Sequence, residues 1–363
     1  MLNKNIEEQY TSDSMTAREA QEKALLYSWA PAVFEVSRLL VDWGILAAID
    51  KSENGLTVEE LCMLTKHKSL AISSLVEAGL TSRILLIDTQ TDRYRLTKLG
   101  WFILNDEMVH VNLAFNHYIN YRSLYHLGKA LETERPEGLT TISDAKNIYE
   151  GLPHLDETSR QAWFDYDHFY SNHSFEQALP YVLDGHPKTI LDVGGNTGEM
   201  ALQLVGKDTD VHVTICDLPA LIEMMHQSIM GKPGADRISG LGADLLDDAQ
   251  CFHGTYDAIW MSQFIMCFPE SQIDTILSRV TQAMHKDSRL YLMEVMWNRQ
   301  PYPAAAFCQT MNSLYFISTA SGNNKMLVSD TLLEHLTKAG LELVATHDQM
   351  GLGGHTLMIL KKI

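Results

Sequence analysis

The chain has 363 residues, of which 45% are hydrophobic and 20% are charged, and its formal net charge is −18 at pH 7. These proportions are typical of a globular protein and exclude a low-complexity or disordered chain. The negative charge disfavours unassisted binding to nucleic acid and to anionic membranes, and the length is sufficient for two or more domains.

The cysteines and the first residues bear on the compartment. Five cysteines are scattered mostly through apolar stretches, which predicts reduced core residues rather than a disulfide or zinc framework. They are Cys62, Cys216, Cys251, Cys267 and Cys308. The N-terminal sequence is polar, and no apolar run approaches the length of a membrane span. We expect a cytoplasmic protein without a membrane segment.

The first hundred residues are predicted to be helical and to end in a hairpin. Residues 15–50 carry apolar positions at three- and four-residue spacings until Gly44 interrupts the pattern. Thr57 and Glu60 then form a capping-box signature at a helix start. Two helices and a hairpin follow, over residues 57–65, 69–80 and 85–97. This order is typical of a winged-helix module.

The charge of this module decides between DNA binding and another role. Residues 51–105 contain seven Lys and Arg residues and six Asp and Glu residues. Such a balance lacks the basic face that neutralisation of phosphates requires. We therefore favour an interaction or dimerisation module and expect no nucleic-acid partner.

The middle of the chain, residues 106–185, is mostly helical in pattern and rich in aromatic residues and histidines. It is either a buried helix layer with partly exposed histidines or the wall of a substrate pocket. No metal-ligand spacing is convincing in this stretch, so we expect no metal site.

From residue 188 onward, strand and helix patterns alternate, which indicates a parallel α/β sheet. The predicted strands are residues 189–193, 211–216, 256–261, 288–295, 341–347 and 355–361. Only a short glycine-rich loop separates the last two, so they form a hairpin at the edge of the sheet. We expect three parts in the chain: residues 1–105, 106–185 and 186–363.

The most informative stretch is TILDVGGNTGEMALQL, residues 189–204. Its apolar run ends in a glycine-rich turn before a helix, where a ligand can approach the backbone and unpaired N–H groups. The turn reads D-V-G-G-N-T-G, which departs from the G-x-G-x-x-G of dinucleotide sites. Asp192 would repel a pyrophosphate and suits a cationic ligand, such as the amino end of a methionine moiety beside a sulfonium. Asp217, at the end of the next strand, is placed to bind ribose hydroxyls.

Together, the winged-helix-like front, the helical middle and the C-terminal sheet resemble the small-molecule O-methyltransferases that use S-adenosylmethionine, the family of plant phenolic and bacterial polyketide methyltransferases. The motifs that carry the resemblance are LDVGGNTG (191–198), CDLP (216–219) and GADLLDD (242–248). The resemblance implies a Rossmann-like class I methyltransferase domain, of α/β class, with a C-terminal antiparallel edge hairpin. It also implies a preceding winged-helix-like dimerisation domain.

The same resemblance implies a homodimer formed through the N-terminal domain. That domain exchanges helices with a second subunit in the family, so residues 20–50 would be buried there. An Arg or Glu in place of Leu39 would then weaken the dimer.

The resemblance also assigns cofactor-binding residues. The glycines would line the methionine end of S-adenosylmethionine, Asp217 would accept hydrogen bonds from the ribose, and residues after the next strand would contact the adenine. The residues so assigned are Asp192, Gly194, Gly195, Gly198, Asp217, Leu218, Asp244, Leu245 and Ser262. Asn196 replaces a glycine of the family, and asparagine tolerates the left-handed backbone better than most residues.

One departure concerns the general base. The family places a histidine in a Leu-His-Asp-Trp sequence after the fourth strand, and here Met266 stands at the histidine position, followed by Cys267 and Phe268. Neither Met266 nor a buried neutral Cys267 readily accepts a proton. Glu294 is present where the family's glutamate orients that histidine, whereas the family's second glutamate, near residues 323–327, is absent.

Candidates remain for the base and for the substrate wall. The possible bases are His117, His168, His173 and Glu294. A helical segment over 304–321 offers Met311, Asn312 and Tyr315 as substrate-lining residues. Three functions stay open: methyl transfer to a small aromatic or apolar metabolite with an altered base, a related reaction without methyl transfer, and a regulatory or non-catalytic role with the cofactor site retained.

Overall fold

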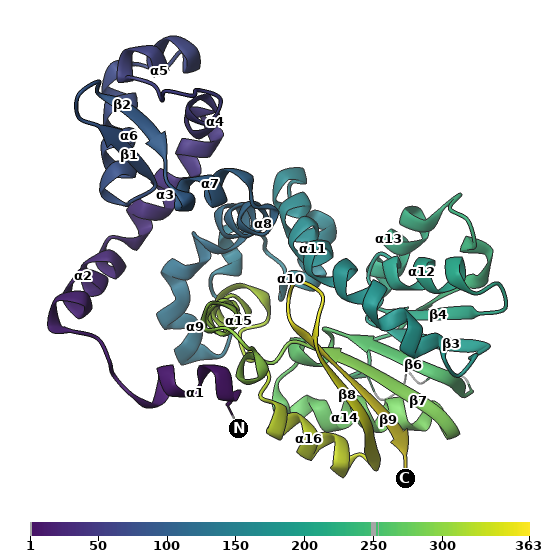
Figure 1. Ribbon diagram of the computed structural model, residues 1–363. Coiled ribbons are helices and arrows are strands. Elements are labelled where there is room, and N and C mark those ends of the chain that lie inside the picture. Colours follow the sequence, from purple (N-terminus) through teal and green to yellow (C-terminus); the bar gives the residue numbers. More distant parts are fainter. Residues whose placement is uncertain (1, 248–251, 253) are drawn as a thin grey trace. The chain divides into compact units, whose positions relative to one another are not determined.

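The computed structural model describes the following residues: 2–247, 252 and 254–363. The chain divides into two compact units (Figure 1). The smaller unit comprises residues 13–116, and the larger unit combines residues 2–12 with 117–363. Of the expected middle part, residues 117–185 therefore belong to the same unit as the sheet, and residues 106–116 belong to the smaller unit.

The smaller unit is helical with one two-stranded hairpin. Its elements are α2 (Ala17–Ser28), α3 (Ala30–Asp42), α4 (Ile45–Asp50), α5 (Val58–Thr65), α6 (Ser69–Thr81), β1 (Leu85–Asp88), β2 (Arg93–Leu96), α7 (Lys98–Asn105) and α8 (Glu107–Phe115). The capping box is confirmed, because Thr57 Oγ1 accepts from the Glu60 backbone nitrogen (3.3 Å) and Glu60 Oε2 accepts from that of Thr57 (2.9 Å). Gly44 ends the preceding pattern with a φ of +69°. The predicted order of helices and hairpin is thus observed.

One break within residues 15–50 was not predicted. Helices α2 and α3 meet at 68°, with Trp29 between them. Pro31 lies in the first turn of α3, where its ring would clash with the carbonyl of the preceding turn if α2 continued. The proline therefore explains why one long helix becomes two.

The core of the smaller unit gathers aliphatic residues from α3, α4, α5, α6 and the hairpin, among them Leu40, Ile45 and Ile72. Leu39 is partly buried and packs against this core. Leu39 therefore stabilises its own unit, and the expected effect of a charge at Leu39 on the dimer stays a prediction.

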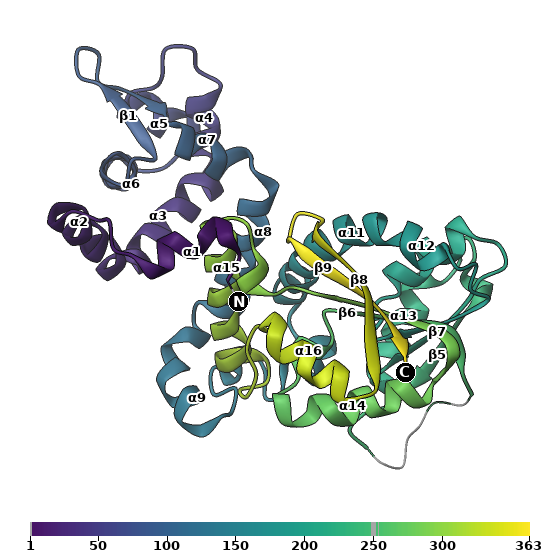
Figure 2. The ribbon, with the colours of Figure 1, turned by 60° about the horizontal axis from the view of Figure 1, so that its bottom comes forward.

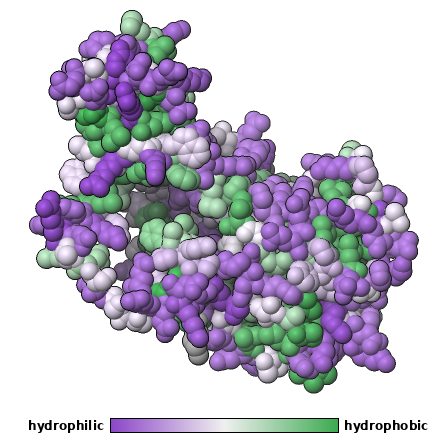
Figure 3. Space-filling view, viewed as in Figure 1, coloured by the Kyte–Doolittle hydropathy of each residue, from purple (hydrophilic) through white to green (hydrophobic). Residues whose placement is uncertain are grey.

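Helix α2 has a different surface, since none of its residues is buried. Leu25, Leu26 and Tyr27 of α2 and the following Trp29 are 58%, 48%, 62% and 69% exposed. Apolar surface among hydrophilic residues is visible in the space-filling view of the molecule (Figure 3). Among the described residues, no single helix is long and apolar enough to cross a membrane. Taken together, the bent pair α2 and α3 has the length and the apolar composition of a membrane span.

The larger unit is built on a seven-stranded sheet of order β5-β4-β3-β6-β7-β9-β8. The strands are β3 (Thr189–Val193), β4 (His212–Asp217), β5 (Ile238–Gly242), β6 (Tyr256–Ser262), β7 (Met284–Glu294), β8 (Leu341–Met350) and β9 (His355–Lys362). The first five of that order are parallel, whereas β9 pairs antiparallel with both β7 and β8. The predicted hairpin at the sheet edge is confirmed.

Helices lie on both faces of this sheet (Figure 2). The α-helices of the larger unit are α1 (Lys4–Thr11), α9 (Leu127–Thr133), α10 (Ile148–Gly151), α11 (Glu157–Leu183), α12 (Glu199–Lys207), α13 (Pro219–Ile229), α14 (Glu270–Gln282), α15 (Pro303–Tyr315) and α16 (Ser329–Lys338). Helices α11, α12 and α13 bury their apolar residues against Trp260, Tyr291 and Met293 of the sheet. Helices α14 and α16 pack on each other at the other face (Figure 2).

The N-terminal helix α1 is attached to the larger unit by specific contacts. The backbone nitrogen of Asn3 donates to the carbonyl of Asn298 (2.8 Å), and its side-chain amide donates to the carbonyl of Arg299. Ile6 is fully buried. The first residues therefore pack on the segment that follows β7, although the next helix, α2, belongs to the smaller unit.

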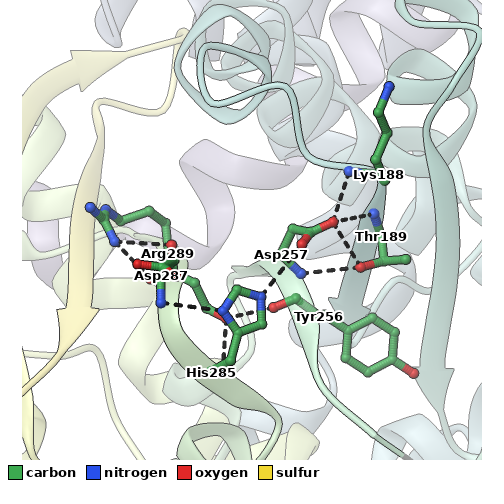
Figure 4. A network of polar contacts seen from close by, with 8 residues as sticks. Lys188, Thr189, Tyr256, Asp257, His285, Asp287 and Arg289 are labelled. Carbon is green, nitrogen blue, oxygen red and sulfur yellow. Dashed lines mark hydrogen bonds and ion pairs between the residues drawn. The ribbon is translucent and has the colours of Figure 1, made fainter.

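A polar network joins the amino ends of three strands (Figure 4). Asp257 Oδ2 of β6 accepts from the backbone nitrogens of Lys188 and Thr189, both at 2.9 Å, ahead of and within β3. His285 Nε2 of β7 lies 3.4 Å from Asp257 Oδ1. These contacts satisfy the polar groups of this edge among themselves, whereas ligands of open α/β sheets bind at the opposite, carboxyl edge.

The described cysteines are all free. Cys216 is buried and Cys62 and Cys267 are half-buried, but Cys308 is exposed, so the expectation of a core position is wrong for Cys308. Cys251 lies outside the described residues.

Candidate active site

The glycine-rich turn between β3 and α12 requires its glycines. Gly194 and Gly198 have φ values of +75° and +87°, which L side chains rarely adopt. A Cβ on Gly194 would lie 2.3 Å from Cδ2 of Phe264, and one on Gly195 would lie 2.8 Å from Oδ2 of Asp192. Asn196 takes the left-handed region with a φ of +48°, as predicted for the residue that replaces a glycine.

Asp217 is held against this turn. Its Oδ2 accepts a hydrogen bond from the backbone nitrogen of Asn196 (3.0 Å), and its Oδ1 accepts from that of Leu218 (2.8 Å). Burial raises the pKa of Asp217 to about 6, although the two hydrogen bonds oppose that shift. The structure thus brings together the turn and the acidic residue that the sequence placed on the neighbouring strand.

Asp192 is a buried carboxylate, with 2% of its surface exposed. Its Oδ2 has no hydrogen-bond partner among the described residues. Burial, and then the charge of Asp217, raise the pKa of Asp192 to about 8. The charge of Asp217 thus adds to the cost of ionising Asp192, and one oxygen of Asp192 has no partner among the described residues. Such a pair of acidic groups fits a cationic ligand.

The remaining assigned residues follow the ends of β5 and β6. Asp244 is exposed and its Oδ1 accepts from the Leu246 backbone nitrogen (2.9 Å), whereas Leu245 is buried. Ser262 ends β6, and its buried Oγ has no hydrogen-bond partner among the described residues. Because these strands are parallel, their carboxyl ends share one edge of the sheet. Asp248, the last residue of the GADLLDD motif, lies outside the described residues.

The segment after β6 carries no base at the position where the resemblance expects one. Met266 is buried, with 4% of its surface exposed, in the short helix η6 (Ile265–Cys267). Glu294, at the end of β7, accepts from the backbone nitrogens of Phe264 (3.1 Å) and Ile265 (2.8 Å) through Oε1. Burial raises the pKa of Glu294 to about 8 against the effect of those hydrogen bonds. Glu294 therefore holds backbone rather than a side-chain base.

Asn324 is a contact of this segment that the sequence did not reveal. Its side-chain amide donates to the carbonyl of Met266. In the sequence, residues 323–327 were notable only because the second glutamate of the resembled family is absent from them. In the structure, an amide from this stretch holds the same backbone that Glu294 holds.

Two residues of α11 reach the glycine turn. His168 Nε2 lies 3.2 Å from Oγ1 of Thr197, and the side-chain amide of Asn196 donates to Oδ2 of Asp167 (3.3 Å). Asp167 was not predicted, and its position beside His168 is the only sequence signal that points to it. His173, by contrast, places Nδ1 2.7 Å from the carbonyl of Phe169 on its own helix.

Aromatic side chains lie near these groups. Trp163 Nε1 donates to the hydroxyl of Tyr315 (2.8 Å), which is buried on α15. Met311 of the same helix is 41% exposed, and the Asn312 amide lies 4.0 Å from the sulfur of Met326. Burial raises the pKa of Tyr315 above its ordinary range. It also raises that of Tyr149, a residue the sequence did not single out.

Cys267 follows Met266, and its thiol donates to the carbonyl of Gln263 (3.3 Å). Burial raises the pKa of the Cys267 thiol far above neutrality, so it is uncharged, as expected from the sequence. Neither Met266 nor Cys267 therefore offers a base to a bound acceptor. Within the described residues, no group of three His, Cys, Asp or Glu side chains is arranged to hold a metal ion.

Comparison with known proteins bears on both units. An O-methyltransferase domain model matches residues 177–340, and a Dimerisation2-like domain model matches residues 21–94. The O-methyltransferase FrzF of Cladobotryum sp is 25% identical over 122 residues, which are 32% of this chain and 28% of that protein. The chain thus spans less than a third of the length of this relative.

Solved structures resemble nearly the whole chain. The mitomycin 7-O-methyltransferase MmcR has a TM-score of 0.72 with 16% identity and covers 95% of this chain and 98% of its own. Human N-acetylserotonin methyltransferase, solved in complex with S-adenosylmethionine, has a TM-score of 0.67 with 14% identity and covers 97% and 99%. The fold is therefore that of class I methyltransferases. The chain therefore consists of a Dimerisation2-like domain followed by an O-methyltransferase domain.

Proposed function

We propose that this protein transfers a methyl group from S-adenosylmethionine to a small aromatic or apolar metabolite. The observation that carries the proposal is the pair Asp192 and Asp217 at a glycine turn, where a buried carboxylate oxygen has no partner among the described residues. S-adenosylmethionine supplies a methyl group on a positively charged sulfur, and its positive charges suit that pair. The match to an O-methyltransferase domain and the cofactor-bound human structure support the same ligand.

Each site residue has a separate task in this proposal. The turn binds the methionine end. Its glycines are required for the turn to pack, because a Cβ at Gly194 or Gly195 would strike Phe264 or Asp192. Asp217 accepts from the ribose hydroxyls, while Asp244 and Leu245 bind the adenine. The unpartnered hydroxyl of Ser262 is available to the cofactor. Much of the rate then comes from holding acceptor, methyl and sulfur in line, which alone lowers barriers substantially.

The substrate side and the assembly belong to the same proposal. Met311, Asn312 and Tyr315 line the acceptor site from α15, with Trp163 holding the Tyr315 hydroxyl. Residues 21–94 match a dimerisation domain, and the exposed apolar face of α2 supports a homodimer through the smaller unit. We take a hydroxyl as the acceptor, with nitrogen and sulfur as the alternatives.

A second function is favoured by one observation. The segment after β6 presents Met266 where the family has its base. This favours, as the second candidate, a reaction that uses the sulfonium charge without methyl transfer, or a regulatory role. Such a protein would bind S-adenosylmethionine and leave it unconsumed. Release of S-adenosylhomocysteine during incubation with acceptors separates the two functions.

The first experiment is calorimetric titration with S-adenosylmethionine and with S-adenosylhomocysteine. We expect micromolar binding of both, and a loss of at least tenfold for Asp217→Asn. Asp210→Asn is the matched control, because Asp210 is a surface carboxylate paired with Lys188 at the opposite edge of the sheet. Absence of binding by the folded wild-type protein would overturn the proposed function.

A further inference from the structure

The structure distinguishes among the four candidate bases. Glu294 Oε1 accepts from backbone N–H groups, and Oε2 is buried without a hydrogen-bond partner among the described residues. Burial raises the pKa of Glu294 to about 8, so this carboxyl already carries a proton near pH 7 and is a poor acceptor. His173 contacts the carbonyl of its own helix. His117 lies in η1 (Asn116–Asn120), outside the elements that form the turn. His168 contacts the glycine turn, with Nε2 3.2 Å from Oγ1 of Thr197. Thr197 directly precedes Gly198, so His168 stands at the methionine end of the proposed cofactor site, where the methyl group is.

The surroundings of His168 suit a residue that gains a proton. Asp167 precedes it on α11 and is fixed by Asn196 of the turn. Burial raises the pKa of Asp167, whereas the positive charge of protonated His168 and the Asn196 hydrogen bond lower it. A carboxylate in this place stabilises an imidazolium beside it.

The other titratable groups facing this part of α11 come from several elements. Asp167 acts electrostatically on Tyr149 of α10, Cys267 of η6 and Tyr315 of α15, and burial raises the pKa of each of these three. They are therefore neutral near pH 7. Asp192 and Asp217 face the turn from β3 and β4, and Tyr166 lies on α11 itself.

We propose that His168 replaces the missing histidine as the proton acceptor of the transfer, an inference that rests on the proposed function. When Nε2–H donates to Thr197 Oγ1, the lone pair of Nδ1 is free to accept. Nδ1 takes the proton of the acceptor hydroxyl, and the oxygen electron pair forms the bond to the methyl carbon. The carbon–sulfur bond breaks with its electron pair left on sulfur. The positive charge thus moves from sulfur to the imidazolium, which Asp167 stabilises before the proton passes to solvent.

The first test measures whether the positive charge of the sulfonium affects the protonation of His168. The pKa of each histidine is measured by NMR titration of the protein bound to S-adenosylmethionine and to S-adenosylhomocysteine, which differ by one methyl group and one positive charge. His168 is assigned by the resonance lost in His168→Gln, and His173 is the internal control. We expect the sulfonium to lower the pKa of His168 by about 0.5 to 1 unit and to leave that of His173 unchanged.

Turnover tests the role itself. With phenols of graded acidity, His168→Gln should lower kcat by about 10²- to 10⁴-fold for weakly acidic phenols, and by progressively less for acidic ones that ionise without help. Its affinity for S-adenosylhomocysteine should stay within about threefold of the wild type. Equal His168 pKa values in the two complexes, or a loss of kcat that is absent or independent of phenol acidity, would overturn the assignment. A protein that binds neither cofactor form refutes the proposed function instead, and the assignment with it.

Discussion

Glu294 Oε1 lies 2.8 Å from the backbone nitrogen of Ile265 and accepts its hydrogen bond, although 29 residues separate the two along the chain. The same oxygen accepts from Phe264, whose ring covers Gly194. One carboxylate at the end of β7 therefore fixes the segment that closes over the glycine turn. A residue known in the resembled family for orienting a histidine keeps a positioning task here without that histidine.

Two substitutions of Glu294 should show how much the hydrogen bonds accepted by Oε1 contribute to the free energy of unfolding. Glu294→Ala leaves two N–H groups without an acceptor in a buried site and is expected to lower the free energy of unfolding by about 1–3 kcal/mol at pH 7. Glu294→Gln keeps an acceptor oxygen and should cost less. Urea denaturation of both variants measures the difference, and equal losses for alanine and glutamine would contradict the role given to Oε1.

Asp192 should link stability to pH. Its pKa is raised from 3.8 to about 8, so the folded protein holds this proton more tightly than the unfolded chain. The contribution of this group to the free energy of unfolding is therefore complete below pH 4 and is lost as the pH rises through about 8. Asp192→Asn removes that loss, and its free energy of unfolding without ligand should exceed that of the wild type by about 1–3 kcal/mol at pH 9.

The same substitution should weaken S-adenosylmethionine binding by at least about tenfold, because the positive ligand loses its buried partner. Urea denaturation at pH 6 and pH 9, together with calorimetry, measures both effects. A variant that is no more stable at pH 9 and binds as well as the wild type would refute the role of Asp192.

Gly194 can be tested against a second glycine. Gly194→Ala introduces a Cβ 2.3 Å from the Phe264 ring at a φ of +75°, and we expect a loss of about 2 kcal/mol or more with weakened cofactor binding. Gly206→Ala is the control, because Gly206 lies within α12 and nothing is within 4 Å of its Cβ position. That variant should be as stable as the wild type or up to about 1 kcal/mol more stable. Thermal unfolding of the two variants measures this difference in stability.

The dimer is best tested on α2. Leu26 is 48% exposed, so Leu26→Glu leaves the core of the smaller unit intact, whereas a charge at Leu39 would damage that core as well. We expect sedimentation velocity to show a wild-type dimer at micromolar concentration and a shift of Leu26→Glu towards monomer. Glu22→Gln, an exposed change on the same helix, should remain dimeric. A monomeric wild type would refute the homodimer.

Local signals explain which parts of this fold were predictable. The capping box at Thr57, the edge hairpin and the left-handed Asn196 each depend on a few adjacent residues, and all are confirmed. Strand β5 was missed because its sequence, ISGLG, contains two glycines and has low β propensity, so pairing with β4 decides its conformation. The break at Trp29 was missed although Pro31 signals it.

The site was predictable to the same extent. The glycine turn and Asp217 follow from the order of strand, turn and strand. The contacts of Asn324 with Met266 and of Asp167 with Asn196 join positions 58 and 29 residues apart, and no spacing rule relates them. Only the folded chain shows that α11 contributes to the turn. The buried state of Asp192, which sets its pKa, is likewise a property of packing.

The packing of α1 on the larger unit makes the smaller unit an insertion with two tethers, one after Ser12 and one before His117. A single proteolytic cut between Ser12 and Thr16 would leave both units on one continuous chain, and only a second cut near residue 116 would release the smaller one. A chain shortened by its first twelve residues loses one tether and the buried Ile6, yet keeps the whole of both folded cores. The chain therefore both enters and leaves the smaller unit from segments that belong to the larger one.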